Sequence, residues 1–237
     1  MCPCRSACAR PRRCPSASAR PRSVACGWCR ISAMSIDPRR TAVLALHWQV
    51  NVVEPEGFFG PMLAEPVARS GVVARAARFH DAAREAGAAV VFTRFTVPED
   101  EGGLVRNTGF MNAVAEAQEA FRPAARSTRL ISAMHVDDAK DLVVDNQKLS
   151  GLAGSDLPEV LAARGIDTVL VTGVATNLTV EQTARHATDL GFTAHVVSDC
   201  VAAADESAHA ASLANLALTT AGCLTAEEAL AELSSAP

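Results

Sequence analysis

The sequence predicts an α/β fold, a three-layer α/β/α sandwich around a mostly parallel sheet of about six strands. Short apolar runs alternate along the chain with segments whose apolar residues recur at helical spacing. The runs are apolar throughout rather than at every second residue, which is typical of parallel strands buried on both faces. Right-handed crossovers then place the helices on both sides of the sheet.

The first half of the globular part shows this alternation clearly. An apolar run at 41–46 predicts a strand that ends at His47, and a loop rich in Pro and Gly follows it. A helix is expected over 67–86, because Val72, Ala76, Phe79 and Ala83 recur on one face. Gly87 ends this helix, as a left-handed glycine commonly does. The next strand is expected at 88–93.

The middle of the chain is less regular. The acidic, glycine-containing stretch 99–103 indicates a surface loop, and 111–121 is expected to be helical. A short strand at 142–144 and a helix at 156–163 follow, and Gly165 ends that helix.

The third quarter of the chain holds its most informative stretch. A β-branched strand at 168–172 breaks at Gly173, and a short turn at 174–177 opens an amphipathic helix. Such a helix presents backbone N–H groups in its first turn, and it faces the carboxyl edge of a parallel sheet, where open α/β folds bind ligands. The remaining elements are expected as a strand, a helix, a strand and a helix at 193–198, 206–217, 223–224 and 226–233.

The first 33 residues differ in composition from the rest. They contain seven Arg and no acidic residue, whereas the remainder has 15 basic against 26 acidic residues. Six of the eight Cys lie there. A zinc module, an organellar transit peptide and a start codon placed upstream of a true start at Met34 all stay open. Residues 1–33 are expected to be disordered, and 34–237 to form one domain.

Several functions of α/β proteins lack their motifs here. No G-x-G-x-x-G, G-x-x-x-x-G-K-[ST], G-x-S-x-G or H-E-x-x-H pattern occurs, so no cofactor and no metal is expected. No apolar run is long enough for a membrane helix. Neither nucleic acid nor a membrane is expected as a partner, although the Arg-rich tail keeps nucleic-acid binding as an alternative. Only Cys200 and Cys223 follow the tail, which favours a reducing cytoplasm, and Cys200 is expected to be a small buried packing residue.

Three ordered blocks resemble the isochorismatase-like (cysteine hydrolase) superfamily. The block GVATNLTV at 173–180 is similar to the family pattern G-V-x-T-[ND]-x-C-V. The blocks TAVLALHWQ at 41–49 and DLVVDNQKLSGLAGSDL at 141–157 resemble the family's first strand and its Lys-containing segment. The resemblance runs from about Thr41 to Ala229 and implies the sandwich fold, a small-molecule substrate, a homo-oligomer and a cis peptide bond between Val174 and Ala175.

The same resemblance implies a triad of Asp, Lys and Cys, and this chain departs from it at all three positions. His47 stands at the Asp position, Asn146 at the Lys position and Thr179 at the Cys position. Asp145 precedes the site and is expected to point to the opposite face. We predict His47, Asn146 and Thr179 as the catalytic residues. The expected substrate-binding residues are Gln49, Arg94, Phe110, Leu152, Val174, Ala175 and Leu178.

The substituted residues leave two kinds of function open. In one, His47 acts as acid or base toward a small carboxylated or amide-bearing metabolite, either by protonating a vinyl ether or by assisting Thr179 as a nucleophile. Asn146, Thr179 and nearby N–H groups would then hydrogen-bond the substrate. In the other, the chain is a catalytically inactive binder of a small molecule or partner. Arg94 could meet a substrate carboxylate or instead pair with Glu99–Glu101.

Overall fold

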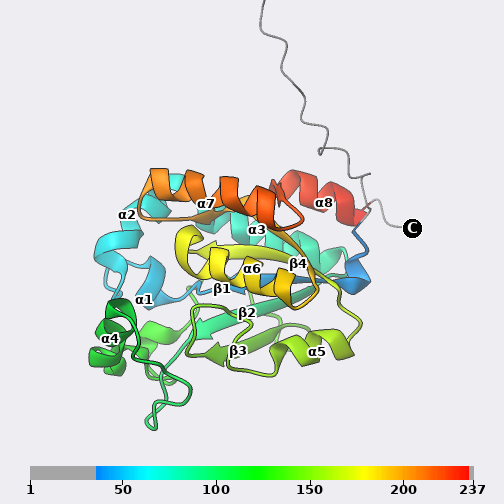
Figure 1. The fold of residues 1–237 in the computed structure, drawn as a ribbon. Coiled ribbons are helices and arrows are strands. Elements are labelled where there is room, and N and C mark those ends of the chain that lie inside the picture. Colours follow the sequence, from blue (N-terminus) through cyan, green and yellow to red (C-terminus); the bar gives the residue numbers. More distant parts are fainter. Residues whose placement is uncertain (1–35, 235–237) are drawn as a thin grey trace, which may run out of the picture. The chain divides into compact units, whose positions relative to one another are not determined.

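A computed structural model describes residues 36–234, so the expectations for residues 1–33 lie outside the described residues. Six strands form one sheet in the order β3-β2-β1-β4-β5-β6, and every neighbouring pair is parallel (Figure 1). The strands are β1 (Thr41–Leu46), β2 (Ala89–Phe95), β3 (Leu142–Asn146), β4 (Thr168–Val174), β5 (Thr193–Ala202) and β6 (Cys223–Leu224). The predicted sheet is confirmed.

Two helical layers enclose the sheet, as the sequence predicts. On one side lie α1 (Val50–Val53), α2 (Gly60–Ser70), α3 (Val72–Glu85) and α8 (Ala226–Ser234). On the other lie α5 (Leu157–Ala163), α6 (Glu181–Asp189) and α7 (Glu206–Thr219). A further helix, α4 (Gly109–Glu116), belongs to a small separate apolar cluster, and single 3-10 turns occur at Pro38–Arg40, Gln118–Phe121 and Arg126–Thr128.

The core divides according to the alternation of strand side chains. In β1 all six residues are buried, but Val43 and Ala45 pack toward α3 and α8, whereas Ala42, Leu44 and Leu46 pack toward α5, α6 and α7. Successive strand side chains point to opposite faces, so a strand covered on both faces must be apolar at every position. This explains the uninterrupted apolar runs in the sequence.

Several boundaries differ from the prediction for identifiable reasons. The helix expected over 67–86 is two helices, because Gly71 adopts a left-handed φ of 66° that ends α2 and begins α3. Gly60 and Pro61 belong to the start of α2 rather than to the preceding loop, since proline fits the first turn of a helix. The helix expected over 111–121 ends at Glu116 and continues only as a 3-10 turn.

The sheet brings distant parts of the sequence to one edge. Leu46 at the end of β1 pairs with Thr93 of β2 and with Gly173 of β4, and Phe95 pairs with Asn146 at the end of β3. The residues that follow these strands therefore meet at the carboxyl edge of the sheet. No helix within residues 36–234 is both long enough and apolar enough to cross a membrane.

Candidate active site

His47 is held by the backbone at the centre of the carboxyl edge. It follows β1 directly, adopts a left-handed φ of 55°, and donates its backbone N–H to the Thr93 carbonyl at 3.1 Å. The side chain is buried, and its Nε2 atom has no hydrogen-bond partner among the described residues. Burial lowers the pKa of His47 to about 4, because an imidazolium is disfavoured away from water. His47 is therefore neutral near pH 7.

Asn146 lies beside His47 at the end of β3 and is completely buried. Its Nδ2 donates to the Ser150 carbonyl at 2.7 Å, which fixes the loop that follows β3. The Asn146 side chain partly offsets the effect of burial on the His47 pKa by hydrogen bonding to the ring. Because His47 Nε2 and Asn146 Oδ1 both lack a partner of normal geometry, this contact is weaker than a full hydrogen bond.

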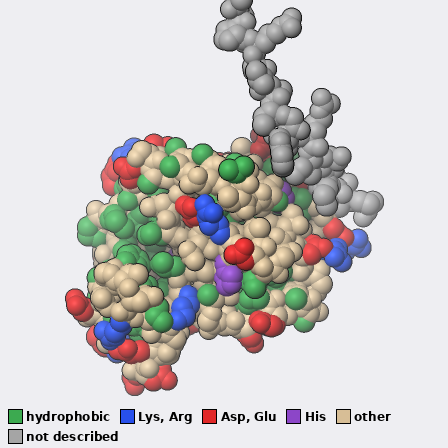
Figure 2. Space-filling view, in the orientation of Figure 1, with side chains coloured by type: hydrophobic (Ala, Val, Ile, Leu, Met, Phe, Trp, Pro, Cys, Tyr) green, Lys and Arg blue, Asp and Glu red, His purple; other side chains and the backbone are tan. Residues whose placement is uncertain are grey.

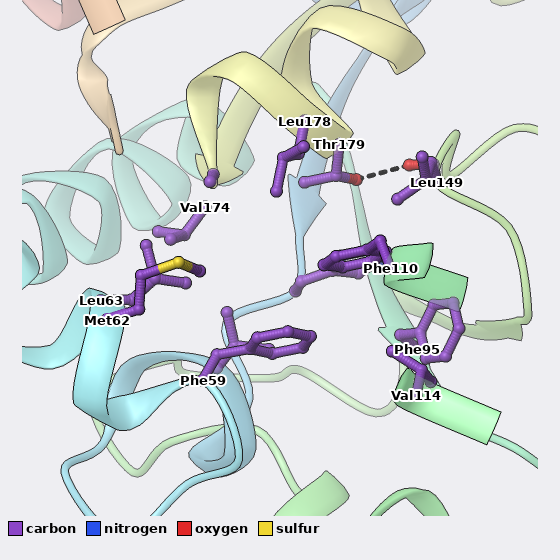
Figure 3. Close-up of a pocket in the computed structure, with 13 residues that line it drawn as sticks. Phe59, Met62, Leu63, Phe95, Phe110, Val114, Leu149, Val174, Leu178 and Thr179 are labelled. Atoms are coloured by element: carbon purple, nitrogen blue, oxygen red, sulfur yellow. Dashed lines mark hydrogen bonds between the residues drawn. The ribbon is translucent and has the colours of Figure 1, made fainter. Parts of the chain in front are cut away.

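Thr179 comes from the turn between β4 and α6. The peptide bond between Val174 and Ala175 is cis, as the family resemblance implies, and a single π-helical turn spans Thr176–Val180 before α6 begins. The Thr179 hydroxyl donates to the Leu149 carbonyl at 2.7 Å (Figure 3). Its proton is thus engaged with the backbone and not with His47, so the predicted Thr–His pair is not formed.

Gly173 permits the close approach of β1 and β4 below this turn. A Cβ atom at position 173 would lie 2.4 Å from the Leu46 carbonyl oxygen, and the glycine has a φ of 138°. Only a residue without a side chain fits here. The close approach brings Val174 and the following turn next to His47.

His47 and Thr179 line one pocket, and Asn146 is not among its lining residues. The centre of a water-sized sphere can occupy about 40 Å³ of this pocket, which is partly open to solvent. The other lining residues are apolar: Val52, Phe59, Met62, Leu63, Phe95, Phe110, Val114, Leu149, Val174, Ala175 and Leu178. Figure 3 shows Phe59 and Phe110 side by side at its wall, where their rings stack with centroids 5.5 Å apart.

Four of the predicted substrate-binding residues line this pocket, namely Phe110, Val174, Ala175 and Leu178. The Leu178 backbone N–H, which we expected to bind substrate, instead donates to the Ala175 carbonyl at 3.2 Å. The predicted turn therefore forms part of the pocket wall, but most of the other apolar lining residues lie outside that turn.

The other three predicted substrate-binding residues lie away from the pocket. Gln49 hydrogen-bonds the backbone of Phe95 and Thr128, so its amide holds the end of β2 to the 3-10 turn at Arg126–Thr128. Leu152 packs in the apolar core on the α5–α7 side. Arg94 forms two hydrogen bonds with Asp145, at 2.7 and 2.8 Å. The alternative pairing of Arg94 with Glu99–Glu101 is not formed, because the parallel register places Asp145 directly opposite Arg94 on β3.

Some pocket residues were not predicted. Phe95 was missed because the strand was expected to end at Thr93, two residues before β2 ends. Met62 and Leu63 belong to a helix that was expected to be a loop. The signal that could have found them is Pro61 in the first turn of that helix.

Other reactive side chains of the fold have structural partners. His80 is buried against Thr172 with 2.8 Å between Nε2 and Oγ1, and burial lowers its pKa to about 3. His186 and His209 contact the hydroxyls of Ser150 and Thr176. Cys200 is buried in the core, as predicted, and burial raises the pKa of its thiol to about 12. Within residues 36–234, no group of three or more His, Cys, Asp and Glu side chains could hold a metal ion.

The geometry allows base chemistry more readily than acid chemistry at neutral pH. A neutral imidazole can accept a proton from a water molecule, whereas protonating a substrate would require the imidazolium, which forms only near pH 4. A Thr hydroxyl needs a base to become nucleophilic, and the Thr179 hydroxyl faces a carbonyl oxygen instead.

Comparisons with known proteins agree on one family. The Isochorismatase domain matches residues 41–228. The chain is 28% identical over 199 residues to the ureidoacrylate amidohydrolase RutB of Methylobacterium radiotolerans, covering 79% of this chain and 77% of the relative. It is 29% identical over 175 residues to the maleamate amidohydrolase of Pseudomonas putida, covering 71% and 78%. The structure of a cysteine hydrolase from Pseudomonas syringae pv. phaseolicola superposes with a TM-score of 0.76 at 25% identity, covering 85% of this chain and 96% of that one.

Proposed function

Because the chain belongs to the isochorismatase family, we propose that it hydrolyses an amide C–N or vinyl-ether bond of a small metabolite, with His47 as the acid/base group. The observation that carries this proposal is that His47 is the one titratable side chain among the residues that line the pocket. Amide hydrolysis is favoured because the relatives named for a reaction are amidohydrolases.

The proposed reaction begins with water in the pocket. The neutral His47 imidazole takes a proton from the water molecule while the water oxygen bonds to the amide carbonyl carbon. The C–N bond then breaks, and the leaving nitrogen takes the proton back from the imidazolium, so the products are a carboxylic acid and an amine or ammonia. A base of pKa about 4 is weak, so this role predicts slow turnover that depends on the orientation of the water.

The alternative function is a binding protein of the same fold that catalyses nothing. One observation favours it: the Thr179 hydroxyl is bonded to the Leu149 carbonyl, so the position that carries the nucleophilic Cys in the family resemblance offers no activated group. Under this alternative, His47 would only hydrogen-bond the bound molecule. We further propose a cytoplasmic homo-oligomer.

The test compares hydrolysis by the full chain and by His47→Gln against a panel of amides, ureides and vinyl ethers. The matched control is His135→Gln, because His135 is exposed and does not line the pocket. If His47 is the base, wild type and His135→Gln hydrolyse one class of compound and His47→Gln loses at least about 100-fold, within the usual range for general-base catalysis.

The pH dependence separates the roles of His47. A base of pKa about 4 gives a kcat/KM that is constant above about pH 5 and falls below pH 4. Acid catalysis gives a rate that rises as the pH falls toward 4. Equal rates for wild type and His47→Gln would refute either role, and binding without hydrolysis would favour the alternative.

A further inference from the structure

The walls of the pocket contain no charged side chain among the described residues. Two lining side chains are polar, and one of them, Thr179, has its hydroxyl proton on the Leu149 carbonyl. Moving a carboxylate from water into such surroundings without a cationic partner costs several kcal/mol. An uncharged group does not meet this cost.

The cationic side chains nearest in sequence to the site elements are engaged elsewhere. Arg94 is held by both oxygens of Asp145 and does not line the pocket. Lys148 donates to the Gly103 carbonyl, and Arg185 pairs with Glu181 on α6. Lys148 and Arg185 line an open groove beside α6 that adjoins the apolar pocket at Leu149, but neither side chain lines the pocket itself. None of the three can neutralise an anion in the pocket without leaving its partner.

Three backbone N–H groups at the helix start beside the pocket already have acceptors. The backbone N–H groups of Leu178 and Val180 both donate to the Ala175 carbonyl, and that of Glu181 donates within the same turn. The carboxylate of Glu181 already occupies the first turn of α6, where it complements the positive end of the helix.

The mouth of the pocket is also apolar. Met62, a lining residue on α2, is among the large hydrophobic residues with exposed side chains. Figure 2 shows that hydrophobic side chains predominate on the visible surface between α2 and α4. A charged ligand would therefore be desolvated already at the entrance.

We infer that this pocket takes an uncharged ligand, a small amide or similar carbonyl compound with a short apolar group, and rejects carboxylates. The inference rests on the proposed function, since it names the substrate class of the same pocket. It departs from the two named amidohydrolases, whose substrates, ureidoacrylate and maleamate, are carboxylates. The carbonyl oxygen or N–H of the ligand would face His47, whose Nε2 lacks a partner among the described residues. The apolar group would fill the space beside Phe59 and Phe110.

The test measures binding rather than turnover, with a pair of compounds of equal shape. Isobutyramide and isobutyrate are titrated into the full chain at pH 7 and followed by ligand-observed NMR. The amide should bind at least about 10-fold more tightly, since burying an unpaired carboxylate costs more than 1.4 kcal/mol. Isobutyrate binding as tightly as the amide would overturn the inference, and so would failure of both compounds to bind.

A charge placed at the mouth gives an independent measurement. Met62 is 45% exposed, so Met62→Arg can keep its guanidinium in water while its stem covers the same surface. This variant should reduce the preference for the amide several-fold, because the exposed guanidinium attracts the carboxylate of isobutyrate. Met62→Gln, which is similar in length and neutral, should leave the preference unchanged. An equal preference in Met62→Arg and Met62→Gln would contradict the inference.

Ammonia release, measured in parallel, separates this inference from the proposed function. Binding of isobutyramide without hydrolysis of any amide leaves the inference standing and refutes the hydrolase. Hydrolysis confined to carboxylate-bearing amides would support the proposed hydrolase and refute the inference that the pocket rejects carboxylates. The two ideas can therefore fail independently.

Discussion

The buried His47 should make the stability of the fold depend on pH, and this dependence can be measured without knowing a substrate. The unfolded chain has an ordinary His pKa of 6.5 at this position, and the folded chain has a pKa of about 4. Because the folded pKa is the lower one, the unfolded state binds the proton first as the pH falls. Stability is therefore complete above pH 6.5 and is lost progressively down to about pH 4.

The expected size follows from these two pKa values. Between pH 7 and pH 5, protonation of the unfolded chain at His47 removes about 2 kcal/mol from the free energy of unfolding. His80 has a folded pKa of about 3, so it adds a similar loss of about 2 kcal/mol over the same interval. The variant His47→Gln keeps only the second of these losses.

The assay is urea unfolding of wild type, His47→Gln and the exposed-site control His135→Gln at pH 7 and pH 5. The quantity compared is the change in free energy of unfolding between the two pH values within each protein, so a difference in absolute stability does not interfere. His47→Gln should lose about 2 kcal/mol less than wild type, whereas His135→Gln, which keeps both buried histidines, should retain the losses that come from His47 and His80. An equal loss in wild type and His47→Gln would show that His47 is not held neutral by burial.

Three further predictions concern other parts of the fold. Gly173→Ala would place a Cβ 2.4 Å from the Leu46 carbonyl oxygen, so it should lower the free energy of unfolding in urea by more than about 3 kcal/mol. The control Gly71→Ala, whose Cβ would have no atom within 4 Å, should lower it by only about 1 kcal/mol. Equal losses of stability in the two variants would contradict the close approach of β1 and β4. Thr179→Val removes the donor to the Leu149 carbonyl and should lower the free energy of unfolding by about 1–2 kcal/mol. The rate of hydrolysis should be the same in Thr179→Val and Thr179→Ser. Loss of hydrolysis in Thr179→Val alone would indicate that Thr179 is a nucleophile. Burial raises the pKa of the Cys200 thiol to about 12, so Cys200 should react with thiol reagents more slowly than the half-buried Cys223 in the folded protein. Peptide mass spectrometry after labelling measures both rates. Faster labelling of Cys200 than of Cys223 would show that Cys200 is accessible.

The sheet and its layers were predictable from the sequence, because a strand buried on both faces has apolar residues at every position. The strand run at 41–46 coincides with β1, and Val180, Ala184 and Ala187 are fully buried as their spacing indicated. Boundaries were less predictable. Gly71 divides one apolar periodicity into two helices, and nothing in that periodicity marks the break.

The sequence indicated where in the fold the candidate site lies, but not which side chains contact one another there. His47 and Thr179 do line one pocket and Asn146 does lie beside His47. The pairing of Arg94 with Asp145 was not predicted, because it depends on the register of β2 against β3, which is a property of the assembled sheet. The burial of His47 and the hydrogen bond of Thr179 likewise depend on side chains that are distant in the sequence. Pairwise contacts of this kind leave no periodic signal.

The strand order has a consequence for how the chemistry of this pocket can change. After β1 the chain crosses to β2 on one side, and after β4 it crosses to β5 on the other, so the two central strands send their connections in opposite directions. A crevice opens between them through topology alone. His47 and Thr179 come from the two separate connections, and Asn146 comes from a third strand end. Each can be replaced without altering the path of the others, so this scaffold permits its reactive groups to be exchanged one at a time while the crevice keeps its place.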